Sequence, residues 1–597
     1  MTYIRTNWVD RDVEFPRRIR LEREDSTQEV VNYDLEPGSI TQQGTPVNAV
    51  NLNNIEEGIV DLDEFVDEQI IYLESSGADD TSNFLNALTE SQNKILVLDR
   101  QGIYTISGTL QPPAGCKIFC RNSIIINNIN TQSALFHITN SNVEISDVSV
   151  MNTTNNPGND GITDAWYLGA NFFIDAINNS VNNIVLNNIN ITNSIDASSA
   201  ITIMGLADNI RVSNCNVWGT GDGWGSCFHA EWMLQAGNVV SPKNIIFENC
   251  IARNNFNATP NCSGFWLSAC SRAKLINCRV ENSLRGFGIY TGDQGKELEH
   301  PVNMSLENCQ TYDIQNECIQ VFSTMTSPDP QMVVNVTNCH FRGADMTESL
   351  SAGARLYYNA GVINFENCIF ENLRRGIYFG DATAGTVTYT VKNCVFDDIY
   401  LQAFYGWRCI NSVIEHNKFK KINISGNSTA FDAVIVFIED SKYNTINANS
   451  FGLDDTVQSC VYIYFVADTD TTSPTENTIS NNFFIGTNNC GVNFSNNATA
   501  LHYLVRNYFY NNQNINQQTP TGGAFIYAKL GDKRLVYTSD VPNTGNWRVG
   551  DYAVKTNVTV AGSAGDRYII SGWTRITSGS NNVLGTDWME DRRLTGT

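Results

Sequence analysis

The chain has 597 residues, with few charged side chains, little positive charge and no long hydrophobic run. Charged residues make up 17% of it, and 62 acidic against 38 basic residues give a formal net charge of −24. This excess of negative charge argues against a nucleic-acid partner, because phosphate binding requires a basic surface. No apolar stretch is long enough to cross a bilayer, and the first residues lack a signal-peptide core. We therefore expect a soluble protein, made in a cytoplasm, that does not insert into membranes.

Cysteine pairs of the CxxC type are also missing, although the chain has 16 cysteines. Without such pairs zinc and redox motifs are poorly supported, and a reducing compartment argues against disulfides. We expect no metal site and no cofactor.

Asn, Ser, Thr and Gly are abundant and 42% of the residues are hydrophobic, which favours turn-rich β structure over helix. An Asn-Cys pair recurs along this background. With Cys as position zero, the copies lie at Cys215, Cys250, Cys278, Cys309, Cys339, Cys368 and Cys394. The register extends back to Val148 and Ile189, and forward to Asn417, Asn449, Asn482 and Asn507. The mean spacing is about 30 residues, typical of stacked repeats.

The apolar columns of this repeat predict its architecture. Position −3 is apolar in every copy and position +2 in nearly every copy. Side chains on one face of a strand are separated by even steps, so the odd step from −3 to 0 requires a bend near position −1. That position is usually Asn, which tolerates the left-handed backbone of a corner. Strand, Asn corner and strand in stacked copies indicate a parallel β-helix. The alternative, a leucine-rich-repeat horseshoe, has a more uniform period.

Residues 77–115, GADDTSNFLNALTESQNKILVLDRQGIYTISGTLQPPAG, resemble the entry segment of pectate-lyase-like β-helices in phage tailspikes. The resemblance implies an all-β fold, a right-handed single-stranded parallel β-helix closed by a capping helix. Asp80 or Thr81 is expected to cap that helix, with Phe84, Leu85 and Leu88 facing the first coil. The superfamily includes lyases, hydrolases and adhesins, so the resemblance does not fix a reaction.

The two ends suggest separate modules. GTPVNAVNLNNIEEGIVDLDEFVDEQI is similar to a segment of tail and baseplate proteins of phages infecting Gram-positive bacteria. Its three-four apolar spacing fits a short trimeric coiled coil or an ordinary amphipathic helix equally well. We expect an N-terminal virion-attachment segment at 1–75, a β-helix at 76–515 and a small C-terminal β cap at 516–597. Together with the resemblance, this implies a homotrimer in the phage tail.

Candidate functional residues lie in the longest intervals between copies and in one loop after Cys278. Acids that could serve as the catalytic pair of a glycosidase are Asp222, Glu231 and Asp293. Flat apolar rings that could bind sugars are Trp166, Tyr167, Trp218, Trp224, Trp232 and Tyr290. The alternative is that the acids are simply solvated and the rings pin their loops. His229 beside Cys227 has no identifiable third group to orient it, which favours a structural role.

These features predict a tailspike or tail-fibre protein that recognises host surface polysaccharide and, if it is an enzyme, cleaves it as a hydrolase or lyase. A non-enzymatic adhesin and a structural baseplate component that binds other tail proteins through residues 1–75 are the alternatives.

Overall fold

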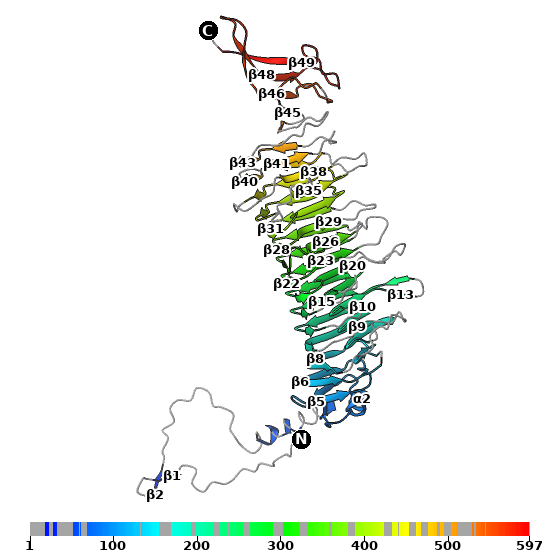
Figure 1. The fold of residues 1–597 in the computed structure, drawn as a ribbon. Helices are drawn as coiled ribbons and strands as arrows, with labels where there is room; N and C mark the ends of the chain where they lie inside the picture. Colours follow the sequence, from blue (N-terminus) through cyan, green and yellow to red (C-terminus); the bar gives the residue numbers. More distant parts are fainter. Residues whose placement is uncertain are drawn as a thin grey trace.

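The computed structural model describes residues 18–22, 28–32, 52–55, 57–58, 60 and most of 68–595. Within 68–595, the segments outside the description are 132, 154–168, 193–198, 220–225, 236–237, 255–262, 291–302, 323–331, 358–360, 380–387, 423–432, 440, 453–460, 467–475, 486–489, 495–502, 511–527, 531–532 and 544. The described part is almost entirely β structure and forms a long shaft of stacked coils (Figure 1). This confirms the predicted all-β class and the parallel β-helix.

Each coil contributes a strand to three parallel sheets, and each strand pairs with its equivalents in the neighbouring coils. Four long strands bend through the corners of the early coils: β6 (Lys117–Asn127), β8 (Glu144–Asn152), β9 (Phe172–Thr192) and β10 (Ile201–Ser213). Besides these, the first sheet contains β3 (Ile70–Leu73), β4 (Ile95–Leu98), β15 (Lys243–Glu248), β18 (Ser271–Ile276), β21 (Asn303–Glu307), β24 (Val333–Thr337), β27 (Val362–Glu366), β30 (Thr388–Lys392), β33 (Val413–Glu415), β36 (Thr445–Asn447), β39 (Thr478–Ser480) and β42 (Tyr503–Val505).

The second sheet contains β5 (Ile103–Ile106), β11 (Asn216–Trp218), β16 (Ile251–Arg253), β19 (Arg279–Ser283), β22 (Gln310–Ile314), β25 (His340–Gly343), β28 (Ile369–Leu373), β31 (Val395–Ile399), β34 (Lys418–Phe419), β37 (Ser450–Phe451), β40 (Phe483–Ile485) and β43 (Tyr508–Tyr510). The third sheet contains β7 (Phe136–Ile138), β12 (Phe228–Glu231), β17 (Phe265–Ser268), β20 (Phe287–Tyr290), β23 (Glu317–Phe322), β26 (Ala352–Tyr357), β29 (Arg375–Phe379), β32 (Phe404–Trp407), β35 (Ala433–Ile438), β38 (Val461–Val466) and β41 (Cys490–Phe494).

The strand register matches the predicted columns. Position −3 pairs coil by coil along the first sheet, as in Val212 with Phe247 and Phe247 with Leu275. Position +2 pairs along the second sheet, where the Phe370 and Phe396 rings stack with centroids 4.8 Å apart. The predicted Asn corners are also present. All nine asparagines at position −1 have φ between 53° and 56°, the left-handed conformation that Asn tolerates: Asn188, Asn214, Asn249, Asn277, Asn308, Asn338, Asn367, Asn393 and Asn481.

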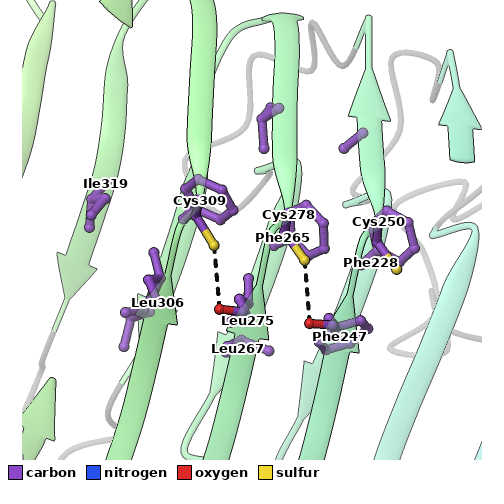
Figure 2. Close-up of a cluster of buried hydrophobic side chains, with 14 of the residues drawn as sticks. Phe228, Phe247, Cys250, Phe265, Leu267, Leu275, Cys278, Leu306, Cys309 and Ile319 are labelled. Carbon is purple, nitrogen blue, oxygen red and sulfur yellow. Dashed lines mark hydrogen bonds between the residues drawn. The ribbon is translucent and has the colours of Figure 1, made fainter. Parts of the chain in front are cut away.

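The Asn-Cys cysteines line the interior and are not bonded to one another (Figure 2). Each thiol points at a backbone carbonyl of the preceding coil: Cys278 Sγ lies 3.4 Å from the Phe247 oxygen, and Cys309 Sγ 3.4 Å from the Leu275 oxygen. The prediction that these residues build the scaffold is confirmed, and the structure adds that they bond to the coil before them.

In the later coils Asn replaces Cys at position zero, and its side chain both donates a hydrogen bond to the preceding coil and accepts one from it. Asn417 Nδ2 donates to the Val391 oxygen at 2.9 Å, and Asn417 Oδ1 accepts the Cys394 N–H at 2.8 Å. Asn449 repeats the pattern on the Ile414 oxygen and the Asn417 N–H. From Cys215 onward, position zero therefore carries a side chain that bonds to the buried backbone of the preceding coil, where an unpaired polar group would be costly.

A helix, α2 (Thr81–Glu90), covers the first coils and buries Phe84 and Leu88 as predicted. Two details of the prediction are wrong. Leu85 is 38% exposed because it lies on the outer side of the helix. Asp80 occupies the N-cap position without a side-chain capping bond, since its carboxylate accepts hydrogen bonds from Ser76 and the Thr105 N–H instead.

The shaft carries smaller elements at its ends and on one side. Residues 52–55, 57–58 and 60 are helical, and β1 (Arg18–Glu22) and β2 (Gln28–Asn32) form a hairpin. A second hairpin, β13 (Met233–Gln235) and β14 (Asn238–Val240), projects beside β10 (Figure 1). At the C-terminal end a six-stranded sheet packs around Trp547, Trp573 and Trp588, and Tyr503 of β42 contacts this core. Its strands are β44 (Ala528–Leu530), β45 (Lys533–Thr538), β46 (Tyr552–Lys555), β47 (Val560–Ala561), β48 (Tyr568–Arg575) and β49 (Trp588–Leu594).

Candidate functional site

Four of the nine sequence-predicted site residues lie within the described part of the chain. Glu231 ends β12 and Tyr290 ends β20, so both belong to the third sheet, and Trp232 follows Glu231 directly. Trp218 is placed apart from them, at the end of β11 in the second sheet, where it is 49% exposed beneath the Arg253 guanidinium. The other five lie outside the described residues: Trp166, Tyr167, Asp222, Trp224 and Asp293.

The outer face of the third sheet brings polar and aromatic side chains together. Phe228, Phe265 and Phe287 stack inside the coil, so the residues after them point outward. We call this outward-facing set, from Glu231 on β12 to Tyr405 on β32, the outer strip. The strands that carry it lie one above another on one side of the shaft (Figure 1). Strand pairing places one column of the strip in successive coils: His229, Trp266, Gly288, Gln320, Arg355, Tyr378 and Tyr405.

Glu231 is held in place by two neighbours. His229 Nε2 lies 2.9 Å from Glu231 Oε2, and Trp266 Nε1 donates to the same oxygen at 3.2 Å. Ser199 Oγ lies 3.5 Å from His229 Nδ1, which fits an imidazole that accepts from Ser199 and donates to Glu231. The expectation that His229 lacks an orienting group is therefore wrong. The contacts with His229 and Trp266 both involve Oε2, and the Glu231 side chain is 17% exposed.

Cys227 belongs to the buried core. It points into the coil and is fully buried among the core side chains. A nucleophile must reach its substrate, so the structure does not support nucleophilic catalysis by Cys227 with His229.

Trp266 contacts both Glu231 and Tyr290. The Trp266 and Tyr290 rings stack with centroids 6.0 Å apart and an interplanar angle of 24°. Gly288 pairs with Trp266 and lies on the same strand as Tyr290, and a Cβ at this position would collide with the Trp266 ring. Trp266 itself is only 3% exposed, so it positions the half-buried Tyr290 and Glu231.

Arginines and tyrosines occupy the next coils of the outer strip. Glu317 accepts from Arg285 Nε at 3.0 Å and from Arg355 Nη1 at 3.1 Å. The Tyr378 ring lies beneath the guanidinium carbons of Arg355, at 5.7 Å, and of Arg375, at 4.5 Å. Tyr378 also packs against Tyr405, with centroids 5.1 Å apart.

Sequence reasoning missed these residues because it concentrated on the loops between copies. Arg355, Tyr378 and Tyr405 lie inside strands, and the only signal was a polar or aromatic residue at the outward positions of the third strand in each coil.

A second histidine–carboxylate pair lies farther down the same sheet. His137 Nε2 is 2.8 Å from Asp175 Oδ2. Burial raises the pKa of Asp175, but the hydrogen bonds from His137 and the Ile177 N–H outweigh it and leave this pKa below its usual value. Asp175 and Glu231 both align with Met204, two coils apart, or about 10 Å between their backbones.

Met204 lies between the two carboxylates in a buried cluster with Phe173, against which Met233 of β13 packs. This apolar packing lies between the strands that carry Asp175 and Glu231.

Nowhere in the part of the chain that the structure describes do three His, Cys, Asp or Glu side chains come together as metal ligands. Among the helices of that part, none has the length and apolar character needed to cross a bilayer.

Comparisons with known proteins give likenesses of structure only. No protein-family model matches the chain, and no curated protein matches its sequence. A similar solved structure is gene product 12 of bacteriophage phi29 in its pre-mature form, with 13% identity, 90% of this chain and 84% of that chain covered, and a TM-score of 0.49.

Two tailspike proteins are also similar. A mutant tailspike of the E. coli bacteriophage HK620 has 10% identity and a TM-score of 0.46, with 93% of this chain and 94% of that chain covered. Tailspike protein 3 of bacteriophage CBA120 has 12% identity and a TM-score of 0.44, with 85% of this chain and 68% of that chain covered. At 10–13% identity such likenesses assign no role to any residue of this chain.

Proposed function

We propose that the chain is a receptor-binding tail protein of a phage, a tailspike, that recognises a host surface polysaccharide along the outer strip. The observation that carries this proposal is the row of half-buried aromatic rings beside fixed polar groups. Tyr290, Tyr378 and Tyr405 offer flat apolar faces, while Glu231 and Arg355 offer hydrogen-bonding groups at their edges. Binding sites combine such apolar surfaces with a few placed polar groups.

Binding to an array of neutral and acidic bacterial polysaccharides tests this proposal. We expect the full chain to bind at least one of them, and Tyr378→Ala to weaken that binding at least about tenfold, since a ring at the centre of an interface carries much of its energy. Trp218→Ala is the matched control, because Trp218 is exposed on the second sheet, and it should bind as the unaltered chain does.

No binding to any polysaccharide, or equal loss in both variants, would contradict the placement of the site. Stable association with tail proteins but with no polysaccharide would favour a structural baseplate component instead.

Cleavage of the polysaccharide is a second candidate function, favoured by the anchored carboxylate of Glu231. Its hydrogen bonds with His229 and Trp266 hold the carboxylate in one position, as is required of a general acid or base in a glycosidase. We expect Glu231→Gln to abolish the release of shorter chains while polysaccharide binding is retained. Release of reducing ends indicates a hydrolase and unsaturated sugars a lyase, whereas binding without either product indicates an adhesin.

We further propose that the chain assembles as a homotrimer in the phage tail and attaches to other tail or baseplate proteins through residues 1–75. The basis is the resemblance to phage tailspikes and to tail and baseplate proteins, together with the three-four apolar spacing in the N-terminal segment. Sedimentation equilibrium of the full chain should give three times the mass of one chain, and a monomer would contradict the trimer.

A further inference from the structure

The outer strip contains a cation that no carboxylate neutralises within the described chain. Arg375, at the start of β29, donates from Nε to Gln402 Oε1 at 3.0 Å, and its guanidinium lies over Tyr378. Neither partner is charged. In the part of the chain that the structure describes, no carboxylate comes within ion-pair distance of Arg375, and its two Nη groups have no hydrogen-bond partner.

The surroundings of Arg375 make this charge costly. Burial lowers the pKa of Arg375, and repulsion by Arg374 and Arg355 lowers it further. The guanidinium nevertheless stays protonated, because an arginine pKa lies far above neutrality. A partly buried, unpaired charge is unfavourable until a counter-charge arrives. The Nη pair also has the planar fork that binds carboxylate or phosphate through two parallel hydrogen bonds.

A second unsatisfied group lies two coils away on the same face. Gln320 pairs in register with Arg355 and is only 6% exposed. Gln320 Oε1 has no hydrogen-bond partner among the described residues. An unpaired buried acceptor favours a ligand that brings a hydroxyl or N–H donor. Tyr378, in the same strand as Arg375 and in the same column as Gln320, supplies an apolar face.

We propose that Arg375 binds an oxyanion carried by the polysaccharide, so that the ligand of the outer strip is an acidic glycan. The inference deepens the proposed function and takes from it only that the ligand is a glycan. A sugar carboxylate and a phosphate in the glycan backbone share this chemistry. Because the whole chain has a net charge of −24, long-range attraction cannot draw a polyanion in, and recognition depends on this short-range site.

Calorimetric titration of the full chain with three oligomers of equal length tests the proposal. The probes are a glucuronic acid hexasaccharide, a glycerol phosphate hexamer and a neutral glucose hexasaccharide. We expect one or both acidic probes to bind more tightly than the neutral one, because only they carry an oxyanion for the guanidinium fork. The probe that binds identifies the oxyanion as carboxylate or phosphate.

Substitutions at Arg375 link this preference to the site. Arg375→Gln removes the charge and should weaken acidic-probe binding at least about tenfold, while leaving the neutral probe unchanged. Arg375→Lys keeps the charge but loses the fork, so its affinity should lie between the two. Arg211→Gln makes the same change at an exposed arginine in the first sheet, and should have no effect. Thermal unfolding of each variant checks that the fold is retained.

The results separate the two proposals. If the acidic probes do not bind better than the neutral one, or if Arg375→Gln binds them as the unaltered chain does, the oxyanion site is wrong. Polysaccharide binding that depends on Tyr378 would then still support the proposed function. If no polysaccharide binds at all, the proposed function itself fails.

Discussion

Position zero of the repeat shows how one residue position satisfies a backbone requirement in two ways. Cys309 contacts the Leu275 carbonyl with a thiol, a weak donor, whereas Asn449 donates to Ile414 and accepts from the Asn417 N–H. The sequence predicted that the side chain points inward, because the column alternates correctly with position −3. It did not predict the hydrogen bonds. A buried Cys is usually treated as a small apolar residue, and an Asn next to a corner resembles a turn residue.

Replacing a ladder asparagine should be costly. In Asn449→Val the Ile414 carbonyl and the Asn417 N–H both lose their partner in the interior, so we expect unfolding to become about 2–4 kcal/mol easier. Denaturant unfolding measures this loss. Lys418→Ser, one residue after Asn417 but exposed on the surface, should change stability by less than about 0.5 kcal/mol. A similar small loss for Asn449→Val would contradict the role of the ladder.

The buried thiols make stability depend on alkaline pH. Burial raises the pKa of Cys318 to about 12, whereas the unfolded thiol has a pKa near 9. The folded state therefore holds its proton where the unfolded state loses it, so this contribution is complete below about pH 9 and declines as the pH rises toward 12.

We expect the free energy of unfolding to fall between these pH values. Cys318→Ala, which removes the titrating group, should show a smaller fall under the same conditions. An identical decline in both proteins would show that Cys318 does not titrate in this way.

At the scale of elements, the sequence predicted two of the three sheets better than the third. From Val148 to Asn507 the repeat marks the corner between the first and second sheets, so the register of these two sheets could be counted from the sequence. Strands of the third sheet lie beyond segments of variable length, such as 255–262 before β17, and lack this marker. Their outward residues, including Gln320 and Arg355, look like ordinary surface positions in one dimension, and only coil stacking brings them together.

The same limit applies to the catalytic hypothesis. Glu231 could be selected from an acidic, aromatic loop, but its partners His229 and Trp266 are fixed by strand alternation and stacking. Asp222 and Asp293 remain predictions, since both lie outside the described residues.

Gly288 tests whether the stacked elements position the site. A Cβ in Gly288→Ala would collide with the Trp266 ring and displace the indole that donates to Glu231. We expect a stability loss of about 1–3 kcal/mol, a changed tryptophan fluorescence spectrum and weaker polysaccharide binding. Gly58→Ala is the control, because a Cβ there meets no atom within 4 Å. Unchanged fluorescence and binding in Gly288→Ala would show that Trp266 does not hold the site.

At the scale of the whole molecule, the shaft presents one sheet face whose character changes along its length. An anchored carboxylate at Glu231 is followed by the arginines and tyrosines between Arg285 and Tyr405, and then by an apolar cluster that includes Val436 and Tyr464. Stacked coils repeat at about 4.8 Å, so a face of several coils is long enough to contact successive units of a linear polymer. A rigid parallel scaffold also keeps these groups in fixed positions without ligand-induced ordering.

The most direct measurement is a crystal structure of the full chain with a fragment of the polysaccharide that binds it on the array. The account predicts sugar rings lying along the third sheet from Glu231 to Arg375, packed on Tyr290 and Tyr378, with an acidic group on the Arg375 guanidinium. Sugar bound over the first or second sheet, or on the C-terminal sheet, would contradict it.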